Sequence, residues 1–499
     1  MTRRVLRASA VLLCCGLLAT ACAAGDERSE DSARPKQGKR DLSLPAWKPA
    51  TADVPRGKGS ELPSDVNGDG HGDLVLPVTY EKKSRLTVVY GSRDGLDPAA
   101  RTAVTGPGSR FSPSGTVRTG DLDGDGFADL VGLFSEVATD PATPGPSDPA
   151  APGTSDPAAP GTPQPTIGQY IVWGGPEGPD PAADPTPLAT AAEPDSITGQ
   201  PGDFDGDGHT DLALTRDDRL ELRYGPFTRG GGAARTSTDW RVPSRLAGSD
   251  CCHDDIAGLT AGDVNGDAAT DLVVQPSGDG EQTAAVLLLG GAAGGRGGRF
   301  PAAEHRLPLG SATALGDFDG DGRGDIAVGD SGGRNNEAVD GSATPHDLAP
   351  IVVAYGSRER YGAPVTKTVR GSEALGLQLE AADLNGDGKD DLITKYGTDM
   401  DAILAKDLKG VVVLHGRDGG LSGTDRHSVR INGPKRYAGK TLKPYDRRIG
   451  IFTAGAFGGA SSELVLTWSR KNVPARWWIS RGDDGTEGIT FSAGQIASR

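Results

Sequence analysis

The strongest constraint on the fold is a nine-residue acidic motif that recurs along most of the chain. It reads Asp-x-(Asp/Asn)-Gly-Asp-x-x-x-Asp and is followed each time by Leu or Ile. Six copies begin at Asp65, Asp121, Asp203, Asp263, Asp317 and Asp383, and a decayed seventh copy occupies Ala456 to Leu464. Successive copies start about 55 to 80 residues apart, and such self-similarity indicates a repeat architecture. The sequence therefore predicts seven structural units.

Each unit is expected to be a small antiparallel sheet. The motif runs into a β-type apolar segment such as 73–76, and a second such segment ends in glycine, as at Gly91. Units of this length hold about four short strands, the content of one propeller blade. With 75 Gly, 36 Pro and only 35% hydrophobic residues, the composition favours turns and short strands over a helical bundle. The predicted fold class is all-β, a seven-bladed β-propeller over residues 61–499.

The motif places oxygen ligands at a spacing that suits calcium. Side-chain oxygens stand at positions 1, 3, 5 and 9, position 7 offers its backbone carbonyl, and glycine forces the turn between them; hard oxygen ligands in this number select calcium. The candidate ligands are Asp65, Asn67, Asp69, His71, Asp73; Asp121, Asp123, Asp125, Phe127, Asp129; Asp203, Asp205, Asp207, His209, Asp211; Asp263, Asn265, Asp267, Ala269, Asp271; Asp317, Asp319, Asp321, Arg323, Asp325; and Asp383, Asn385, Asp387, Lys389, Asp391.

Two other interpretations of the motif are weaker. An EF-hand needs Glu at position 12 and flanking helices, whereas position 12 is Leu76 in the first copy and never Glu in the other five. Asp/Asn/Gly clusters also make good turns without metal, but six copies with the same oxygen positions favour a metal. We expect calcium-binding loops holding about six structural Ca²⁺ ions. The site should be weakest in the fourth loop, where Ala268 replaces glycine, and absent from the seventh copy.

The N-terminus has the features of an export signal. Arg3, Arg4 and Arg7 precede an apolar run that is too short to span a membrane but suits a signal peptide. The sequence Leu18-Ala19-Thr20-Ala21-Cys22 resembles a bacterial lipobox. We expect a signal peptide at 1–21, lipidation of Cys22, and a lipid-attached flexible tether at 22–60 that anchors an extracytoplasmic protein. Because Ala19-Thr20-Ala21 also suits ordinary signal peptidase, a secreted form is the alternative.

Two internal features interrupt the repeats. Residues 138–166 form a Pro/Ala-rich tract that cannot bury a core, so we expect a disordered insert in the second blade. The adjacent Cys251 and Cys252 are the cysteines outside the export segment. A vicinal disulfide is favoured there, with intermolecular bonds or a soft-metal site with His253 as alternatives.

The repeats resemble the FG-GAP/VCBS family, whose best-known members are the blades of the integrin α-subunit propeller. The resemblance covers about residues 61–499 and implies a seven-bladed propeller with calcium loops on one face and a role in adhesion or recognition. The literal tags occur only as Phe457-Gly458 and Gly362-Ala363-Pro364, so the chain looks nearer the bacterial VCBS-type branch.

The function expected from these features is binding at the cell surface rather than catalysis. The partner would be a cell-surface protein or a glycan, with the membrane reached only through the N-terminus and the propeller acting as a monomer. The net charge of −16 argues against nucleic acid. No His/carboxylate constellation for acid–base chemistry emerges, and Gly433 to Thr441 only approaches a P-loop spacing. The alternative is an extracytoplasmic carbohydrate-active enzyme or a glycan-binding lectin built on the propeller.

A set of aromatic or histidine side chains precedes the glycine that ends the second apolar segment. They are Tyr90, Trp173, Tyr224, Tyr355 and His415. Such a ring can stack on sugars, but side chains at matched strand positions more often pack one blade against the next. We therefore expect them in the core.

Overall fold

The computed structural model describes residue 46 and residues 48–497, apart from residues 82, 105–110, 137–165, 189–197, 217, 244–255, 277–281, 292–299, 331–348, 358, 360–361, 374, 397–409, 430, 459–460, 471–472 and 483–486. The chain divides into two compact units, Met1–Arg40 and Asp41–Arg499, and the described residues all belong to the second. The expected signal peptide, Cys22, the tether up to residue 45, nearly all of the 138–166 insert, and Cys251 and Cys252 lie outside the described residues.

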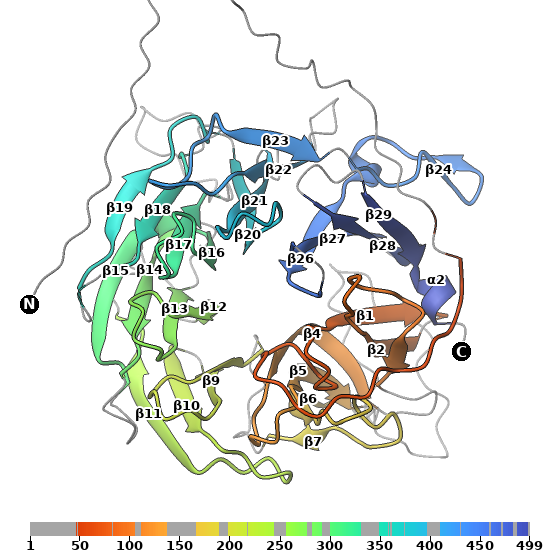
Figure 1. Ribbon diagram of the computed structural model, residues 1–499, viewed down its shortest axis with the longest axis horizontal. Helices are drawn as coiled ribbons and strands as arrows, with labels where there is room; N and C mark the ends of the chain where they lie inside the picture. Colours follow the sequence, from red (N-terminus) through yellow and green to blue (C-terminus); the bar gives the residue numbers. More distant parts are fainter. Residues whose placement is uncertain are drawn as a thin grey trace, which may run out of the picture. The chain divides into compact units, whose positions relative to one another are not determined.

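The second unit is a seven-bladed β-propeller, as predicted (Figure 1). Neighbouring strands in each sheet are antiparallel. Blade by blade, the strands are β1 (Leu74–Tyr80), β2 (Lys83–Val89), β3 (Arg101–Ala103); β4 (Phe111–Gly120), β5 (Asp129–Glu136), β6 (Thr166–Val172), β7 (Thr186–Pro187); β8 (Gln200–Gly202), β9 (Asp211–Arg216), β10 (Arg219–Tyr224), β11 (Arg235–Arg241); β12 (Ile256–Gly262), β13 (Asp271–Pro276), β14 (Thr283–Leu289), β15 (Ala303–Gly310); β16 (Ala312–Gly316), β17 (Asp325–Gly329), β18 (Val352–Tyr355), β19 (Val365–Thr368); β20 (Leu375–Ala382), β21 (Asp391–Tyr396), β22 (Val411–Leu414), β23 (Arg426–Val429); and β26 (Gly450–Gly455), β27 (Glu463–Arg470), β28 (Val473–Arg481), β29 (Glu487–Ser492).

In the described part of the chain, three short features lie outside the blades. A hairpin of β24 (Arg436–Tyr437) and β25 (Lys440–Thr441) and the 3₁₀ turn η1 (Tyr445–Arg447) lie between the sixth and seventh blades, and the helix α2 (Ala493–Ile496) follows β29. None of the helices in the described part of the chain is long and apolar enough to cross a bilayer.

The sequence repeat is offset from the blade by one strand. In blades 2 to 6 the acidic motif lies between the first and second strands, as between β4 and β5, and in blade 1 it directly precedes β1. A repeat that begins at the motif therefore supplies the last three strands of one blade and the first strand of the next. Because no repeat precedes residue 65, blade 1 has only three strands among the described residues.

The core is divided into seven hydrophobic clusters, one at each interface between neighbouring blades. The cluster between blades 3 and 4, for example, joins Phe204 and Trp240 to Leu272 and Phe300. Because each sheet packs on both faces, its central strands are almost continuously buried, as β14 is. Tyr90, Tyr224 and Tyr355 are buried in these clusters, as the sequence predicted.

The ring closes between blade 7 and blade 1 without a shared strand. A cluster containing Leu74 and Leu76 of β1, Trp477 and Phe491 of blade 7, and Ile496 of α2 fills this interface. Ala46 forms a parallel bridge with Thr490 of β29. Residues 52–60, assigned to the tether from sequence, instead bond to the propeller, for example through the Ser60 N–H and the Gly126 carbonyl. The tether therefore ends before residue 52, earlier than the residue 60 expected from the sequence.

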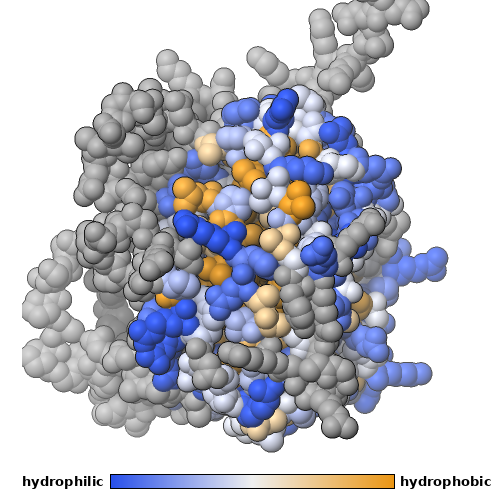
Figure 2. Space-filling model, turned by 90° about the vertical axis from the view of Figure 1, so that its left-hand side faces the viewer, coloured by the Kyte–Doolittle hydropathy of each residue, from blue (hydrophilic) through white to orange (hydrophobic). Residues whose placement is uncertain are grey.

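The outer side of the ring is mixed in character. Figure 2 shows one such side, where hydrophobic residues are interspersed with hydrophilic ones. Among the described residues, the large hydrophobic side chains with the greatest exposure are Leu309 on β15 and Val365 on β19, at 62% and 63%. Both lie on the fourth strands of their blades.

Candidate metal centres

The six acidic motifs form six loops of one design, numbered here 1 to 6: 65–73, 121–129, 203–211, 263–271, 317–325 and 383–391. Each loop joins the first strand position of a blade to its second strand, so all six lie on one rim of the ring. Strands rather than helices flank them, which agrees with the exclusion of an EF-hand.

The carboxylate at position 1 shapes each loop. In loop 1 the Oδ1 atom of Asp65 accepts hydrogen bonds from the N–H groups of Gly68 and Asp69, and its Oδ2 atom accepts one from Gly70. The same contacts from positions 5 and 6 recur in the other five loops. Gly68 has a φ of +68°, a conformation that favours glycine because it has no Cβ atom.

The carboxylate at position 9 ties each loop to its blade. Asp73 is 3% exposed; its Oδ2 atom accepts from the N–H of Val66, and its Oδ1 atom accepts at 2.9 Å from the N–H of Gly91. The matching glycines in the other blades are Gly174, Gly225, Gly290, Gly356 and Gly416, and each donates to its own position-9 aspartate. These are the glycines that end the second apolar segment of each repeat in the sequence.

The residue at position 3 turns an unsatisfied oxygen into the loop. One side-chain oxygen of Asn67, Asp123, Asp205 and Asp319 is buried and has no hydrogen-bond partner in the described part of the chain. In loops 2, 3 and 5 one oxygen each from positions 1, 3 and 9 lies within 4.8 Å of the others. Buried oxygens without a partner are unfavourable unless a cation or water meets them. These acidic clusters can therefore hold a metal ion, and their all-oxygen donor set fits calcium.

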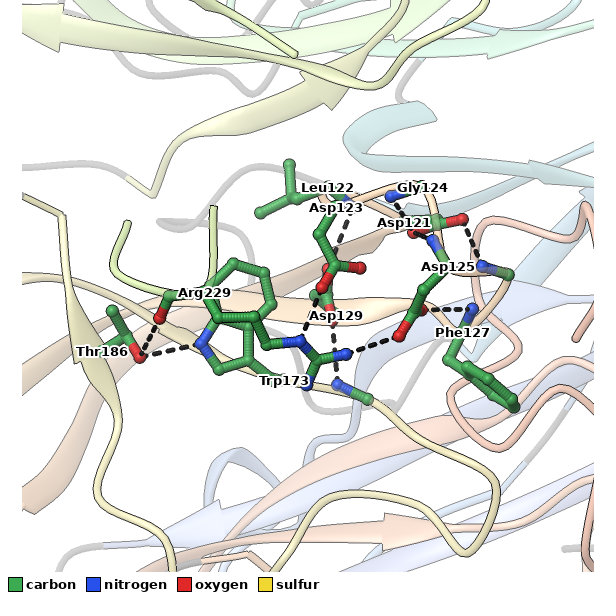
Figure 3. Close-up of polar contacts among 12 residues, drawn as sticks. Asp121, Leu122, Asp123, Gly124, Asp125, Phe127, Asp129, Trp173, Thr186 and Arg229 are labelled. Atoms are coloured by element: carbon green, nitrogen blue, oxygen red, sulfur yellow. Dashed lines mark hydrogen bonds and ion pairs between the residues drawn. The ribbon is translucent and has the colours of Figure 1, made fainter. Parts of the chain in front are cut away.

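The carboxylate at position 5 bonds within the loop and is not part of the clusters formed by positions 1, 3 and 9. Its Oδ1 atom accepts from the N–H of position 7, as Asp125 does from Phe127 at 3.1 Å (Figure 3). In loop 2 the Oδ2 atoms of Asp123 and Asp125 meet the guanidinium of Arg229, from the β10–β11 connection of blade 3. Arg229 also lies over the ring of Trp173, 5.2 Å from its centroid.

Arginines also pair with loops 3 and 5, which, like loop 2, carry carboxylates at all four of positions 1, 3, 5 and 9. Arg235 pairs with Asp205 of loop 3 and lies over the ring of Tyr224. Arg323, at position 7 of loop 5, pairs with Asp321. Loops 2, 3 and 5 are the ones with Asp rather than Asn at position 3. An arginine thus offsets the additional carboxylate.

Position 7, expected to act through its backbone, also packs each loop against its neighbour. A Cβ atom on Gly68 of loop 1 would lie 2.6 Å from the ring of Phe127 of loop 2, and one on Gly320 of loop 5 would lie 3.0 Å from Lys389 of loop 6. The side chain at position 7 thus covers the glycine at position 4 of the preceding loop. This contact joins the rim from blade to blade.

Backbone hydrogen bonds join the rim as well, always from one blade to the preceding one. The N–H of Ala128 in loop 2 donates to the carbonyl of Asp65 in loop 1 at 2.8 Å. At four other interfaces the corresponding position-8 bonds are Thr270 to Asp203, Gly324 to Asp263, Asp390 to Asp317 and Ser462 to Asp383. At the remaining two interfaces the bonds come from the segments that follow β10 and β2, and they run from Phe227 to Leu122 and from Ser92 to Phe457. Every interface in the ring therefore has such a bond, including the closing one.

Burial raises the pKa of the position-9 carboxyl in loops 1 to 5. The pKa of Asp73 rises to about 8, and those of Asp129, Asp211, Asp271 and Asp325 rise to about 7, because burial disfavours the charged form. The two backbone N–H groups on each carboxylate lower the pKa, and neighbouring loop carboxylates raise it. A bound cation would favour the charged form, so these groups suit a metal that competes with protons.

The fourth and seventh motifs differ from the others. Ala268 adopts a φ of +69°, and its N–H still reaches Asp263 Oδ2 at 2.8 Å, so loop 4 keeps the common shape in a conformation unfavourable for alanine. In the seventh motif Ser462 makes the position-8 bond, so Glu463 rather than Leu464 occupies position 9. The sequence alignment of this copy was wrong by one residue, because its loop is one residue shorter.

Sequence reasoning missed a partner that comes from another blade at Arg229 and partners from neighbouring strands of the same blade at His415. Arg229 is 104 and 106 residues from Asp125 and Asp123, and no local pattern marks it. His415 is half-buried, stacked on His427 with ring centroids 5.0 Å apart, and its Nδ1 atom lies 3.4 Å from Asp391 Oδ1. The recurring glycines at the strand ends were visible in the sequence, although their role as donors was not.

The chain is similar to several solved structures at low sequence identity. No curated protein sequence matches the chain. Similar solved structures include an Agrocybe aegerita lectin specific for non-reducing terminal N-acetylglucosamine (15% identity, 77% of this chain and 92% of that chain, TM-score 0.38). Others are a GH43_1 enzyme from Xanthomonas citri (13%, 54% and 81%, 0.27) and the V. cholerae biofilm matrix protein Bap1 (12%, 90% and 83%, 0.27).

One part of the chain matches a family model. Residues 65–132 match the FG-GAP-like repeat. The match contains loops 1 and 2, and loops 3 to 6 reproduce the motif and the hydrogen bonds of those two. The chain is thus a seven-bladed β-propeller in which residues 65–132 match the FG-GAP-like repeat.

Proposed function

We propose that this protein is exported, is anchored to the cell membrane through a lipid on Cys22, and acts there as a calcium-binding recognition module. The observation that carries the calcium assignment is the buried, unpartnered oxygen at position 3 of four loops. In three of these, loops 2, 3 and 5, position 3 also lies close to carboxylates at positions 1 and 9. Six loops would hold six Ca²⁺ ions in a structural role. The ions would order the rim, while recognition would use surfaces away from the loops.

Calcium is expected to stabilise the propeller rather than to take part in chemistry. Two or more carboxylates converge in each loop, and their mutual repulsion is relieved when a divalent cation binds. A ligand that binds the folded state alone raises stability by mass action. The partner we propose is a cell-surface protein or a glycan, bound by a monomeric propeller without catalysis.

The first test is to count the bound ions. The mature chain is stripped with EDTA, Ca²⁺ is added back, and bound metal and thermal unfolding are measured together. About six ions per chain with a large rise in melting temperature are expected from the six loops. Absence of binding would mean that the acidic loops are only turns.

The second test addresses recognition. Labelled mature protein is applied to intact cells and to a glycan array, with Ca²⁺ or with EDTA, and sugar release from any bound glycan is measured. Calcium-dependent binding without sugar release supports a recognition module. Release of sugar would instead establish a carbohydrate-active enzyme, and membrane fractionation of a Cys22→Ser variant tests the anchor separately.

A further inference from the structure

The segment between blades 6 and 7 concentrates positive charge on an acidic protein. Residues 435–448 contain six basic side chains and one acidic side chain, whereas the whole chain carries −16. In the structure this segment is the β24–β25 hairpin followed by η1, so the approximate P-loop spacing at Gly433 to Thr441 belongs to an antiparallel hairpin and not to a nucleotide site. Like charges gathered at one place need a physical reason.

The hairpin is fixed to blade 7 by its apolar and backbone groups. The ring of Tyr437 meets that of Trp468 edge to face at 6.1 Å, Trp468 Nε1 donates to the Asp446 carbonyl at 2.9 Å, and Leu442 packs on the cluster between blades 6 and 7. Asp446, the one acidic residue, is paired with Arg470 of β27 at 2.8 Å. The carboxylate of the segment is therefore already neutralised.

This anchoring leaves three cations facing solvent. Arg436, Lys440 and Lys443 are exposed, and none forms an ion pair in the described part of the chain. Tyr437, which is paired with Lys440 across the hairpin, is 38% exposed. Figure 1 shows β24 projecting beyond β28 and β29 at the periphery of the ring. Exposed cations bind anionic groups, and a half-exposed aromatic ring suits the border between polar and apolar layers. Together they form a surface suited to a polyanion whose charged groups border an apolar layer.

The course of the N-terminal chain indicates which polyanion this surface meets. Ala46 pairs with Thr490 of β29, so the chain enters the propeller at blade 7, the blade to which the hairpin is fixed. If Cys22 carries the lipid of the proposed function, the chain that leads from the lipid joins the ring at blade 7. We propose that Arg436, Lys440 and Lys443 form a docking surface for anionic phospholipid headgroups, which orients the anchored propeller.

The test uses the lipid-free mature chain, residues 23–499, so that it does not depend on the anchor. Its co-sedimentation is measured with vesicles of phosphatidylglycerol and phosphatidylcholine and with vesicles of phosphatidylcholine alone. Each cation at an anionic surface strengthens binding about 5-fold. The triple variant Arg436→Glu/Lys440→Glu/Lys443→Glu should therefore bind the anionic vesicles at least about 100-fold more weakly. Binding of the native chain should also fall with added salt.

A matched variant separates local from overall charge. Lys58→Glu/Arg93→Glu/Arg370→Glu changes the net charge equally at exposed positions elsewhere and should bind like the native chain. Equal loss in both variants, or no preference of the native chain for anionic vesicles, would overturn the proposal, as would retention on an acidic polysaccharide without vesicle binding.

The Arg436→Gln/Lys440→Gln/Lys443→Gln variant serves if charge reversal impairs folding. Failure of the anchor would appear only in cell fractionation, and failure of calcium binding only in ion counts.

Discussion

The Oε2 atom of Glu463, at the start of β27 in the last blade, accepts a hydrogen bond at 3.0 Å from the N–H of Leu96 in the first blade. Its Oε1 atom meets Arg481 Nε at 2.7 Å. Glu463 occupies the position that aspartate holds in the six loops. There the carboxylate bonds within its own blade, whereas in blade 7 it reaches across the closing interface of the ring.

Removing this carboxylate should open the closing interface. Glu463→Ala leaves the Leu96 N–H and the Arg481 side chain without their partner, so we expect a loss of about 2–3 kcal/mol in the free energy of unfolding. Urea denaturation measures the loss. Glu487→Ala, an exposed position in the same blade, is the control and should change stability by less than about 0.5 kcal/mol. Equal effects of the two substitutions would show that Glu463 is not needed for closure.

The unusual backbone of loop 4 predicts a stabilising substitution. Because Ala268 has a φ of +69°, Ala268→Gly should stabilise the protein by about 0.5–1 kcal/mol and tighten calcium binding in that loop. The reverse substitution, Gly208→Ala in loop 3, is the matched control, since its φ is +90° and an added Cβ atom would meet nothing within 4 Å. It should destabilise by a similar amount. Thermal unfolding of both variants checks the pair, and opposite signs are required.

Arg229 predicts a difference between the protein with and without calcium. Without calcium, Arg229→Gln leaves Asp123 and Asp125 of loop 2 facing two further carboxylates, so stability should fall by about 0.5–1 kcal/mol. Millimolar Ca²⁺ should restore most of the loss, because the ion offsets the same charges. Arg219→Gln, which removes an exposed pair with Asp218, should lose little under either condition. A loss that calcium leaves unchanged would contradict the charge-offset explanation.

Glu380 on β20 predicts a pH dependence independent of the loops. Burial raises its pKa to about 7, while Arg118 on β4 opposes the rise. The folded state therefore binds a proton more tightly than the unfolded chain between about pH 4.5 and 7, so this group's contribution to stability falls as pH rises. Glu380→Gln should stabilise by the order of 1 kcal/mol at pH 8, since partial exposure screens the charge, and should change little at pH 4. Equal effects at both pH values would contradict this.

The periodic part of the structure was predictable because it is encoded locally. Each loop carries its own turn glycines and carboxylates within nine residues. The glycine whose N–H donates to the position-9 carboxylate follows the second strand after the loop. The number of blades follows from counting these units. The burial of Tyr90, Tyr224 and Tyr355 also followed from their matched positions, because side chains at equivalent strand positions pack against the neighbouring blade.

What sequence reasoning missed depends on contacts between distant segments or on small changes in length. Arg229 reaches loop 2 only because blade 3 packs beside blade 2. The deletion in the seventh motif is obscured by Phe457-Gly458, which resembles the normal frame, so Glu463 could be assigned only from its bonds. The offset between repeat and blade also follows from strand pairing, which the repeat period alone does not determine.

The hydrogen bonds that run from each blade to the preceding one have a consequence for how the chain can vary in length. They form an unbroken belt around one rim, and eight residues separate the first and second strands in each of blades 2 to 6. At the other rim, the connection from second to third strand ranges from residues 217–218 in blade 3 to residues 137–165 in blade 2. Insertions can thus lengthen the loops at the other rim, where they can contact new partners. The inter-blade hydrogen bonds at the first rim meanwhile keep the circumference of the ring unchanged.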